Sequence, residues 1–379
     1  MTLSALDETL FHQVPLEFEH AATTDHRFFD RHMGSAFAHD GSAGVTFGMG
    51  LYKNMNVLDG FAAVQHNAQT QENLRLSRPL RPELEMKLGP LRIEIIEPLK
   101  SLRYILDRGG DYPHSFDLTF KSFLPPHLED PHFGRIDGRL ATDYLRYCQS
   151  GHLNGLITLG GEEIPVRDWY MWRDHSWGVR PNVGGFDPFT GTGGQGTFPS
   201  AIRTGGKGLL LFGFGFATPE FGGYMSLLEN GLGERVYLTG HLGFPGGANL
   251  KVVDVEGYDV HFVDRTRDFS RMDIRFRTED GRTWEARNEA VGRTWIFKGL
   301  GYDGGYNDGK GQGVYRGAEL HQESDAYDVR EIGRPRFPDG AIAKSSHREQ
   351  HCRTTINGVE GDSYIPLIVL GNNHRYQFD

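Results

Sequence analysis

The chain has 379 residues, which is long for one hydrophobic core and favours two domains or one large two-part β structure. A formal net charge of −10 without a Lys/Arg cluster argues against nucleic acid or an anionic membrane surface as a partner. Mean hydropathy is negative and no apolar run approaches the length of a membrane span, so we expect a soluble protein. The chain has only two cysteines, fewer than a disulfide-stabilised secreted protein would carry, and its N-terminus lacks a signal-peptide pattern. We therefore expect a cytoplasmic protein.

The first half of the chain reads mainly as short strands. We expect a start segment over residues 1–40, with a short helix at 3–12. Alternating apolar residues between glycines then predict strands at 44–54, 61–70, 91–98, 101–108 and 115–124. Residues 125–150 are predicted to be a proline-rich connection, followed by a hairpin over 153–166 that turns at Gly160-Gly161.

The second half continues this pattern after a long Gly/Pro/Thr loop at 181–207. Strands are predicted at 208–218, 224–230, 235–242, 249–257, 259–266 and 294–302, with a hairpin within 270–290 that turns at Glu279-Asp280-Gly281. The 51 glycines argue against a helical protein, because glycine in a helix interior costs about 1 kcal/mol relative to alanine. The chain is therefore predicted to be all-β and antiparallel, built from two fused barrel-like domains.

Three of the five tryptophans lie between residues 169 and 177, around an Asp-His pair at Asp174 and His175. In a strand, Trp169, Met171, Arg173, His175 and Trp177 would share one side, and Tyr170, Trp172, Asp174 and Ser176 the other. Aromatic walls exclude water and raise the pKa of a carboxyl group, as a general acid requires, and indole faces stabilise a developing cation. The pattern suits protonation of an alkene, or else a tryptophan-rich seam in which Asp174 binds an amide or an arginine.

Two further stretches carry weaker signals. HREQHC (347–352) places two histidines four residues apart beside Cys352, but a zinc site needs more ligands, and we read this stretch as an exposed polar strand. YDGGYNDGKGQGVYRG (302–317) matches neither a P-loop nor a calcium loop, and is either a mobile loop over a cavity mouth or a plain surface loop. GxSxG does not occur, so an α/β-hydrolase triad has no support, and no histidines form HExxH. Neither a cofactor nor a metal is predicted.

DHSWG, residues 174–178, resembles the signature of the carotenoid 1,2-hydratase and AttH-like proteins, a group related to kievitone hydratases and some fungal Diels–Alderases. The resemblance implies two lipocalin-like antiparallel β-barrel or sandwich domains in tandem, with the signature near their junction. It places the family's acid on Asp174 and its histidine and tryptophan on His175 and Trp177. The hydratases also use an aromatic residue and an acid on a following strand, but LLLFGFGFAT (209–218) holds no acid. Either Asp174 or a loop acid such as Asp187 or Asp303 would take the place of this acid, or the chain carries out different chemistry.

Together these observations predict an N-terminal segment (1–43), a first lipocalin-like domain (44–190) and a second (191–379). The function predicted is that of a cofactor-independent, hydratase-like lyase or isomerase acting on a hydrophobic isoprenoid, polyketide or aromatic in an aromatic-lined cavity. Asp174 would be the general acid and His175 its orienting partner or relay. The residues predicted to bind substrate are Tyr170, Trp172, Arg173, Trp177, Tyr306 and Tyr315. A non-catalytic carrier of a hydrophobic ligand is the alternative, and a homodimer is left open.

Overall fold

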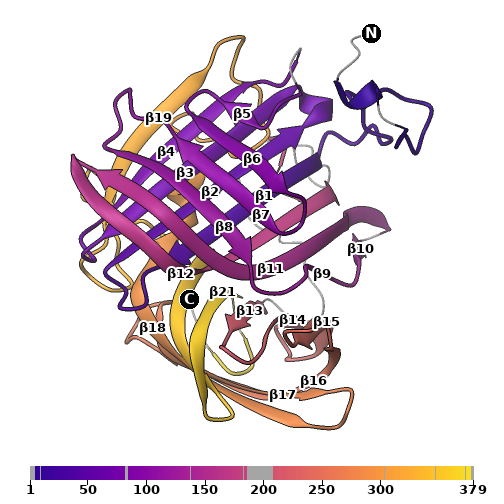
Figure 1. Ribbon diagram of the computed structural model, residues 1–379, viewed down its shortest axis with the longest axis vertical. Helices are drawn as coiled ribbons and strands as arrows, with labels where there is room; N and C mark the ends of the chain where they lie inside the picture. Colours follow the sequence, from indigo (N-terminus) through magenta and orange to yellow (C-terminus); the bar gives the residue numbers. More distant parts are fainter. Residues whose placement is uncertain are drawn as a thin grey trace.

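The computed structural model describes residues 5–8, 10–81, 84–136, 138–181, 183–185, 208–302, 304–345, 347–371 and 373–376. Within these ranges the chain forms two β structures and short 3₁₀ turns, without an α-helix. The first β structure lies above the second in Figure 1. The predicted all-β class with two lipocalin-like domains is thus confirmed.

The first structure is a 13-stranded curled antiparallel sheet, ordered β19-β4-β3-β2-β1-β12-β11-β8-β7-β6-β5, with β9 and β10 also paired to β11. β19 comes from the second half of the chain and adds to the edge beside β4 (Figure 1). The strands are β1 (Phe28–Phe37), β2 (Ala43–Tyr52), β3 (Val57–His66), β4 (Thr70–Pro79), β5 (Lys87–Leu88), β6 (Leu91–Glu97), β7 (Ser101–Leu106), β8 (His114–Ser122), β9 (His127–Leu128), β10 (His132–Ile136), β11 (Arg139–Leu159), β12 (Glu162–Val179) and β19 (His321–Asp328).

The second structure is a closed antiparallel barrel. It consists of β13 (Leu209–Ala217), β14 (Gly222–Asn230), β15 (Arg235–Gly243), β16 (Asn249–Phe262), β17 (Phe269–Thr278), β18 (Thr283–Ile296), β20 (Arg348–Ile356) and β21 (Val359–Leu370). Its β13 shows how the sequence builds a barrel wall. Phe212, Phe214 and Phe216 enter the core, while the glycines between them face outward. The 3₁₀ turns are η1 (Ala5–Glu8), η2 (Lys53–Met55) and η3 (Phe297–Leu300).

Both predicted hairpins form, at Gly160-Gly161 and at 279–282. Several stretches differ from the prediction. The strand expected at 61–70 spans the turn between β3 and β4, and the strand expected at 294–302 ends at Ile296, where η3 begins. The start segment contains β1, which pairs with both β2 and β12. The connection predicted at 125–150 contains β9, β10 and the first half of β11. The two strands expected at 249–257 and 259–266 are one bulged strand, β16, because bulges absorb the breaks in its alternation.

Each sheet has its own apolar core on the inner face. The core of the first sheet includes Phe47, Leu118 and Met171, and the core of the barrel includes the three phenylalanines of β13. A third cluster joins them, because the outer face of β1, β3, β11 and β12 packs against the barrel and η3. Trp172 and Trp295 are its largest side chains. We call this interdomain layer the seam.

The segment after η3 covers the outer face of the first sheet through a buried carboxyl group. Gly313 N donates to Asp59 Oδ2 at 2.6 Å, and Asp59 on β3 is almost fully buried. Burial raises the pKa of Asp59 to about 6, although the Gly313 amide and the nearby Arg316 and Arg31 oppose the shift. Its ionisation above this pH therefore acts against folding.

Asp59→Asn should stabilise the protein at pH 7 and above. A carboxyl group whose pKa is raised from 3.8 to about 6 costs no stability below pH 3.8, and its cost grows as pH rises through 6. This difference between the pKa values of the folded and unfolded states corresponds to about 3 kcal/mol of stability. Asparagine removes this cost and still accepts the Gly313 hydrogen bond. Urea unfolding at pH 4 and pH 7 measures the difference, with exposed Asp264→Asn as the control. An equal effect of Asp59→Asn at both pH values would contradict this account.

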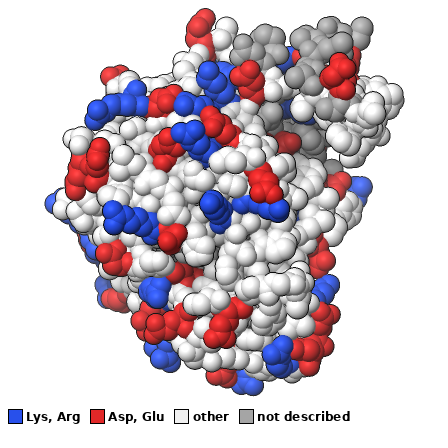
Figure 2. Space-filling view, viewed as in Figure 1, with Lys and Arg blue, Asp and Glu red and all other residues white. Residues whose placement is uncertain are grey.

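Charges of both signs are interspersed over the face drawn in Figure 2, as expected for ladders of ion pairs on exposed strands. Arg103 with Asp117, and Arg277 with Asp254, are examples. None of the helical turns in the described ranges is long and apolar enough to cross a membrane.

Candidate functional site

A β-bulge at Asp168 decides which side of β12 faces inward. Asp168 adopts a left-handed backbone conformation (φ 52°), and Asn154 on β11 holds it through two hydrogen bonds of 2.9 Å. Before the bulge the even-numbered Ile164 and Val166 enter the first core, and after it the odd-numbered Trp169 and Met171 do. The bulge therefore turns Arg173, His175 and Trp177 to the inner face and Asp174 to the seam.

His175 lies on this inner face between two hydrogen-bonding partners. Its Nε2 is 2.7 Å from Asp30 Oδ1 on β1, and its Nδ1 is 3.2 Å from the Tyr147 hydroxyl on β11. Because an ionised carboxylate only accepts, Nε2 carries the proton of the neutral ring and Nδ1 accepts from Tyr147. The side chains of His175 and Asp30 remain 35% and 39% exposed, so solvent reaches the pair.

Arg173 lies two residues deeper on the same face and is 1% exposed. Its Nε and Nη2 donate to Gln149 Oε1 at 3.0 and 2.5 Å, and its Nη1 donates to the Tyr147 hydroxyl at 3.4 Å. The guanidinium also lies 5.3 Å from the ring centroids of Phe120 and Tyr147. A continuous chain of hydrogen bonds therefore runs from the buried Arg173 through Tyr147 and His175 to Asp30.

Aromatic rings and a second histidine surround this chain. The ring of Trp177 is 5.4 Å from that of His175 and 6.3 Å from that of Tyr147. His32 on β1 bonds the Tyr104 hydroxyl at 2.8 Å, and burial together with the charge of Arg173 holds the pKa of His32 well below its usual range. His32 therefore stays neutral and does not add positive charge beside Arg173.

Asp174 lies on the opposite face, in the seam, opposite Cys148 on β11 and Met33 on β1. Burial raises its pKa, although Arg146 and Arg31 oppose the shift. His175 therefore does not orient Asp174, because adjacent residues of a strand point to opposite sides. The expected partnership of these two side chains is replaced by that of His175 with Asp30.

Trp172 and Tyr170 also face the seam. Trp172 stacks on Tyr364 at 4.9 Å, and Tyr170 hydrogen-bonds Ser150 at 3.1 Å. Gly215 on β13 makes room for the indole, since a Cβ there would lie 2.4 Å from Trp172 Cδ1. The bulky ring thus fills the space over a glycine, and Trp172 does not share a cage with Trp177.

Tyr306 and Tyr315 do not reach the inner face either. Tyr306 is buried on the outer face of the first sheet, where its hydroxyl donates to the Leu76 carbonyl at 3.1 Å beneath the Arg316 guanidinium. Tyr315 is 46% exposed. Of the predicted substrate-binding residues, the structure gathers Arg173 and Trp177 around His175. Asp187 and Asp303 lie outside the described residues.

HREQHC forms part of β20 but is not exposed, since residues 348–352 are all buried, with His351 facing the first sheet and Cys352 in the core of the barrel. His351 hydrogen-bonds Ser35 at 2.9 Å, and His347 bonds Glu349 at 2.7 Å. These contacts belong to the seam, which the alternating pattern could not reveal because both sides of the strand are covered. In the ranges that the structure describes, His, Cys, Asp and Glu side chains form no group of three placed to hold a metal ion.

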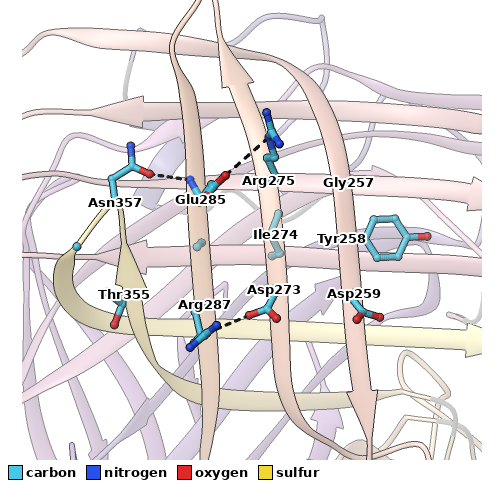
Figure 3. A pocket seen from close by; sticks show the side chains of 12 residues that line it. Gly257, Tyr258, Asp259, Asp273, Ile274, Arg275, Glu285, Arg287, Thr355 and Asn357 are labelled. Atoms are coloured by element: carbon cyan, nitrogen blue, oxygen red, sulfur yellow. Dashed lines mark hydrogen bonds and ion pairs between the residues drawn. The ribbon is translucent and has the colours of Figure 1, made fainter.

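Two hollows lie away from His175. An open one of about 660 Å³ lies on the outer face of β16–β18, where Arg287 and Asp273 approach within 3.5 Å (Figure 3). Its lining of paired charges suits water better than an apolar ligand. The other lies in the seam beside Cys148, Tyr224 and His241, and its volume of about 10 Å³ is at most that of one water molecule.

Sequence reasoning missed Asp30, Tyr147 and Gln149. Asp30 and His175 are 145 residues apart, and only the pairing of β1 with β12 brings them together. The available signal was polar alternation, because FFDRHMGS places Asp30 and His32 on one face and DYLRYCQS does the same for Tyr147 and Gln149.

These two β structures define a lipocalin-like fold of two parts. A protein from Nitrosomonas europaea, provisionally assigned as AttH, superimposes with a TM-score of 0.52 at 13% identity, covering 94% of this chain and 98% of that one. This likeness confirms, at the level of the fold, the resemblance seen in DHSWG. The chain itself belongs to a family of unknown function (DUF8625), whose model matches residues 3–194.

Other solved structures are more distant. Kievitone hydratase from Nectria haematococca gives a TM-score of 0.41 at 9% identity, covering 89% of this chain and 88% of that one. CghA with Sch210972 gives 0.48 at 9% identity, covering 92% and 90%. No curated protein matches the chain in sequence.

Proposed function

We propose that the chain is a cofactor-independent, hydratase-like lyase or isomerase that acts on a hydrophobic small molecule at the inner face of the first sheet. The observation that carries this proposal is the hydrogen-bonded series Asp30–His175–Tyr147 on the inner face, beside the half-buried Trp177. In lipocalins a sheet curled around an apolar core holds one small ligand, and the first sheet is curled around such a core.

The chemistry follows from the protonation states. His175 Nδ1 accepts a proton, either from substrate directly or through the Tyr147 hydroxyl, and Asp30 stabilises the resulting imidazolium at Nε2. The same ring then returns the proton to another atom of the substrate. Removal and return of one proton is what both a lyase and an isomerase need. The proposal therefore gives the acid–base role to His175 with Asp30, and leaves Asp174 in the seam.

A carrier of hydrophobic ligands is the alternative function, and one experiment separates the two. Native mass spectrometry of the purified protein, followed by extraction, identifies the bound small molecule. The extract is then incubated with fresh protein in D₂O. Deuterium incorporation that depends on the protein supports the enzyme, and a bound ligand that gains no deuterium and is not converted supports the carrier. An empty protein that also fails to bind apolar fluorescent probes would overturn both.

A further inference from the structure

The inner face of the first sheet holds a buried positive charge that no described carboxylate neutralises. Arg173 is almost fully buried, and its partners are the neutral Gln149 and Tyr147 and the ring of Phe120. Within the described residues no ion pair joins Arg173 to an acid. The carboxylate of the series, Asp30, is bound to His175 instead.

Such an arrangement is costly unless it serves a ligand. A buried charge without a counter-ion loses its hydration, and arginines in protein interiors are normally paired. A guanidinium has five N–H donors. Arg173 uses three of them in the hydrogen bonds described above, and all three acceptors are neutral oxygens. The remaining donors match the planar lone pairs of a carbonyl or oxyanion.

The positive charge of Arg173 also favours reactions with a negatively charged intermediate over reactions with a positively charged one. Protonation of an isolated alkene creates a carbocation, which a nearby guanidinium repels. Removal of a proton next to a carbonyl creates an enolate, which the same guanidinium stabilises where water is excluded. The base required for the second route, His175, is linked to Arg173 through the Tyr147 hydroxyl.

We infer that the substrate carries a carbonyl oxygen that Arg173 binds, and that the reaction passes through the enolate of this carbonyl. In the dehydration direction His175 Nδ1 takes a proton from the carbon beside the carbonyl, and the C–H electron pair forms C=C while the carbonyl π pair moves to oxygen. The enolate then re-forms the carbonyl as the C–O bond to a β-hydroxyl breaks. That hydroxyl takes the proton from the imidazolium and leaves as water, and hydration is the reverse. This inference rests on the proposed function and narrows its substrate class.

The test compares two probes of similar shape, 4-nitrophenol, which ionises, and 4-nitroanisole, which does not. Wild-type protein should bind the phenolate more tightly than the anisole, and bound nitrophenol should ionise at a lower pH than free nitrophenol, as read from its absorbance. Arg173→Met should weaken phenolate binding by about 10- to 100-fold and leave anisole binding unchanged. Arg173→Lys should retain most of the preference, because it keeps the charge.

Arg167→Met is the matched control, since Arg167 is an exposed arginine on the same strand. Its binding of both probes should equal that of the wild type. Equal affinity of the wild type for both probes, or binding of neither, overturns the inference. So does a parallel loss of both probes in Arg173→Met while Arg173→Lys binds like the wild type. The proposed function fails separately, through the absence of deuterium incorporation into the extracted ligand.

Discussion

His175→Gln should lower the turnover of the extracted ligand by about 100- to 10,000-fold, the usual contribution of a positioned acid–base group. Glutamine keeps one hydrogen-bonding contact with Asp30 or Tyr147 but cannot accept and return a proton. Because the His175 side chain is 35% exposed, the melting temperature should change little. Rates of deuterium incorporation and of product formation, with thermal unfolding in parallel, measure the two effects.

Asp174→Asn is the matched control for this experiment, because it changes the neighbouring residue on the other face of β12. Burial raises the pKa of Asp174, so an amide of the same shape should cost less than about 1 kcal/mol of stability at pH 7. Turnover should stay near that of the wild type. A loss in Asp174→Asn as large as that in His175→Gln would return the acid role to Asp174.

Arg146→Met should lower the free energy of unfolding by about 3–5 kcal/mol, the cost of leaving a buried charge without its partner. Arg146 donates to both oxygens of the fully buried Glu129, at 2.6 and 2.9 Å, and to the Tyr224 hydroxyl across the seam at 3.1 Å. Urea unfolding measures the loss. Arg287→Met, which removes an exposed partner of Asp273, is the control and should cost at most about 1 kcal/mol.

The pH dependence gives a second check on this pair. Burial alone would raise the pKa of Glu129, but Arg146 and His132 outweigh burial and lower it from 4.5 to about 2. A lowered carboxyl pKa contributes stability that is fully present above pH 4.5 and is lost as pH falls through 2. The penalty of Arg146→Met should therefore be largest above pH 4.5 and shrink below it. A penalty that does not change with pH would contradict this account, because the loss would then not come from the pairing with the ionised Glu129.

Most of the fold class was predictable from the sequence because strand alternation and turn glycines are local signals. The hairpin at Gly160-Gly161 and the phenylalanine ladder of β13 are examples. β1 was missed because its polar side is largely buried as well as its apolar side. The sequence therefore lacks the clear alternation of apolar and exposed polar residues that marks a half-buried strand. The burial of β20 was missed for a related reason: its side chains are polar and suggest exposure, but they are hydrogen-bonded inside the seam.

The candidate site was predictable only in part. The clustered tryptophans pointed to β12 as the site. The bulge at Asp168, however, reverses the alternation along that strand. Its left-handed backbone (φ 52°) could not be predicted, because no glycine marks the position. The residues that complete the site, Asp30 and Tyr147, come from strands distant in sequence. The tryptophans consequently divide between two tasks, Trp172 in the seam and Trp177 beside His175.

The most direct test of the central claim is a crystal structure of the protein with its extracted ligand bound. We expect the ligand on the inner face of the first sheet, with an oxygen within hydrogen-bonding distance of Arg173 and its reacting carbon near His175 and Tyr147. A ligand bound instead in the seam beside Asp174, or in the hollow on the outer face of β16–β18, would contradict this assignment of the site.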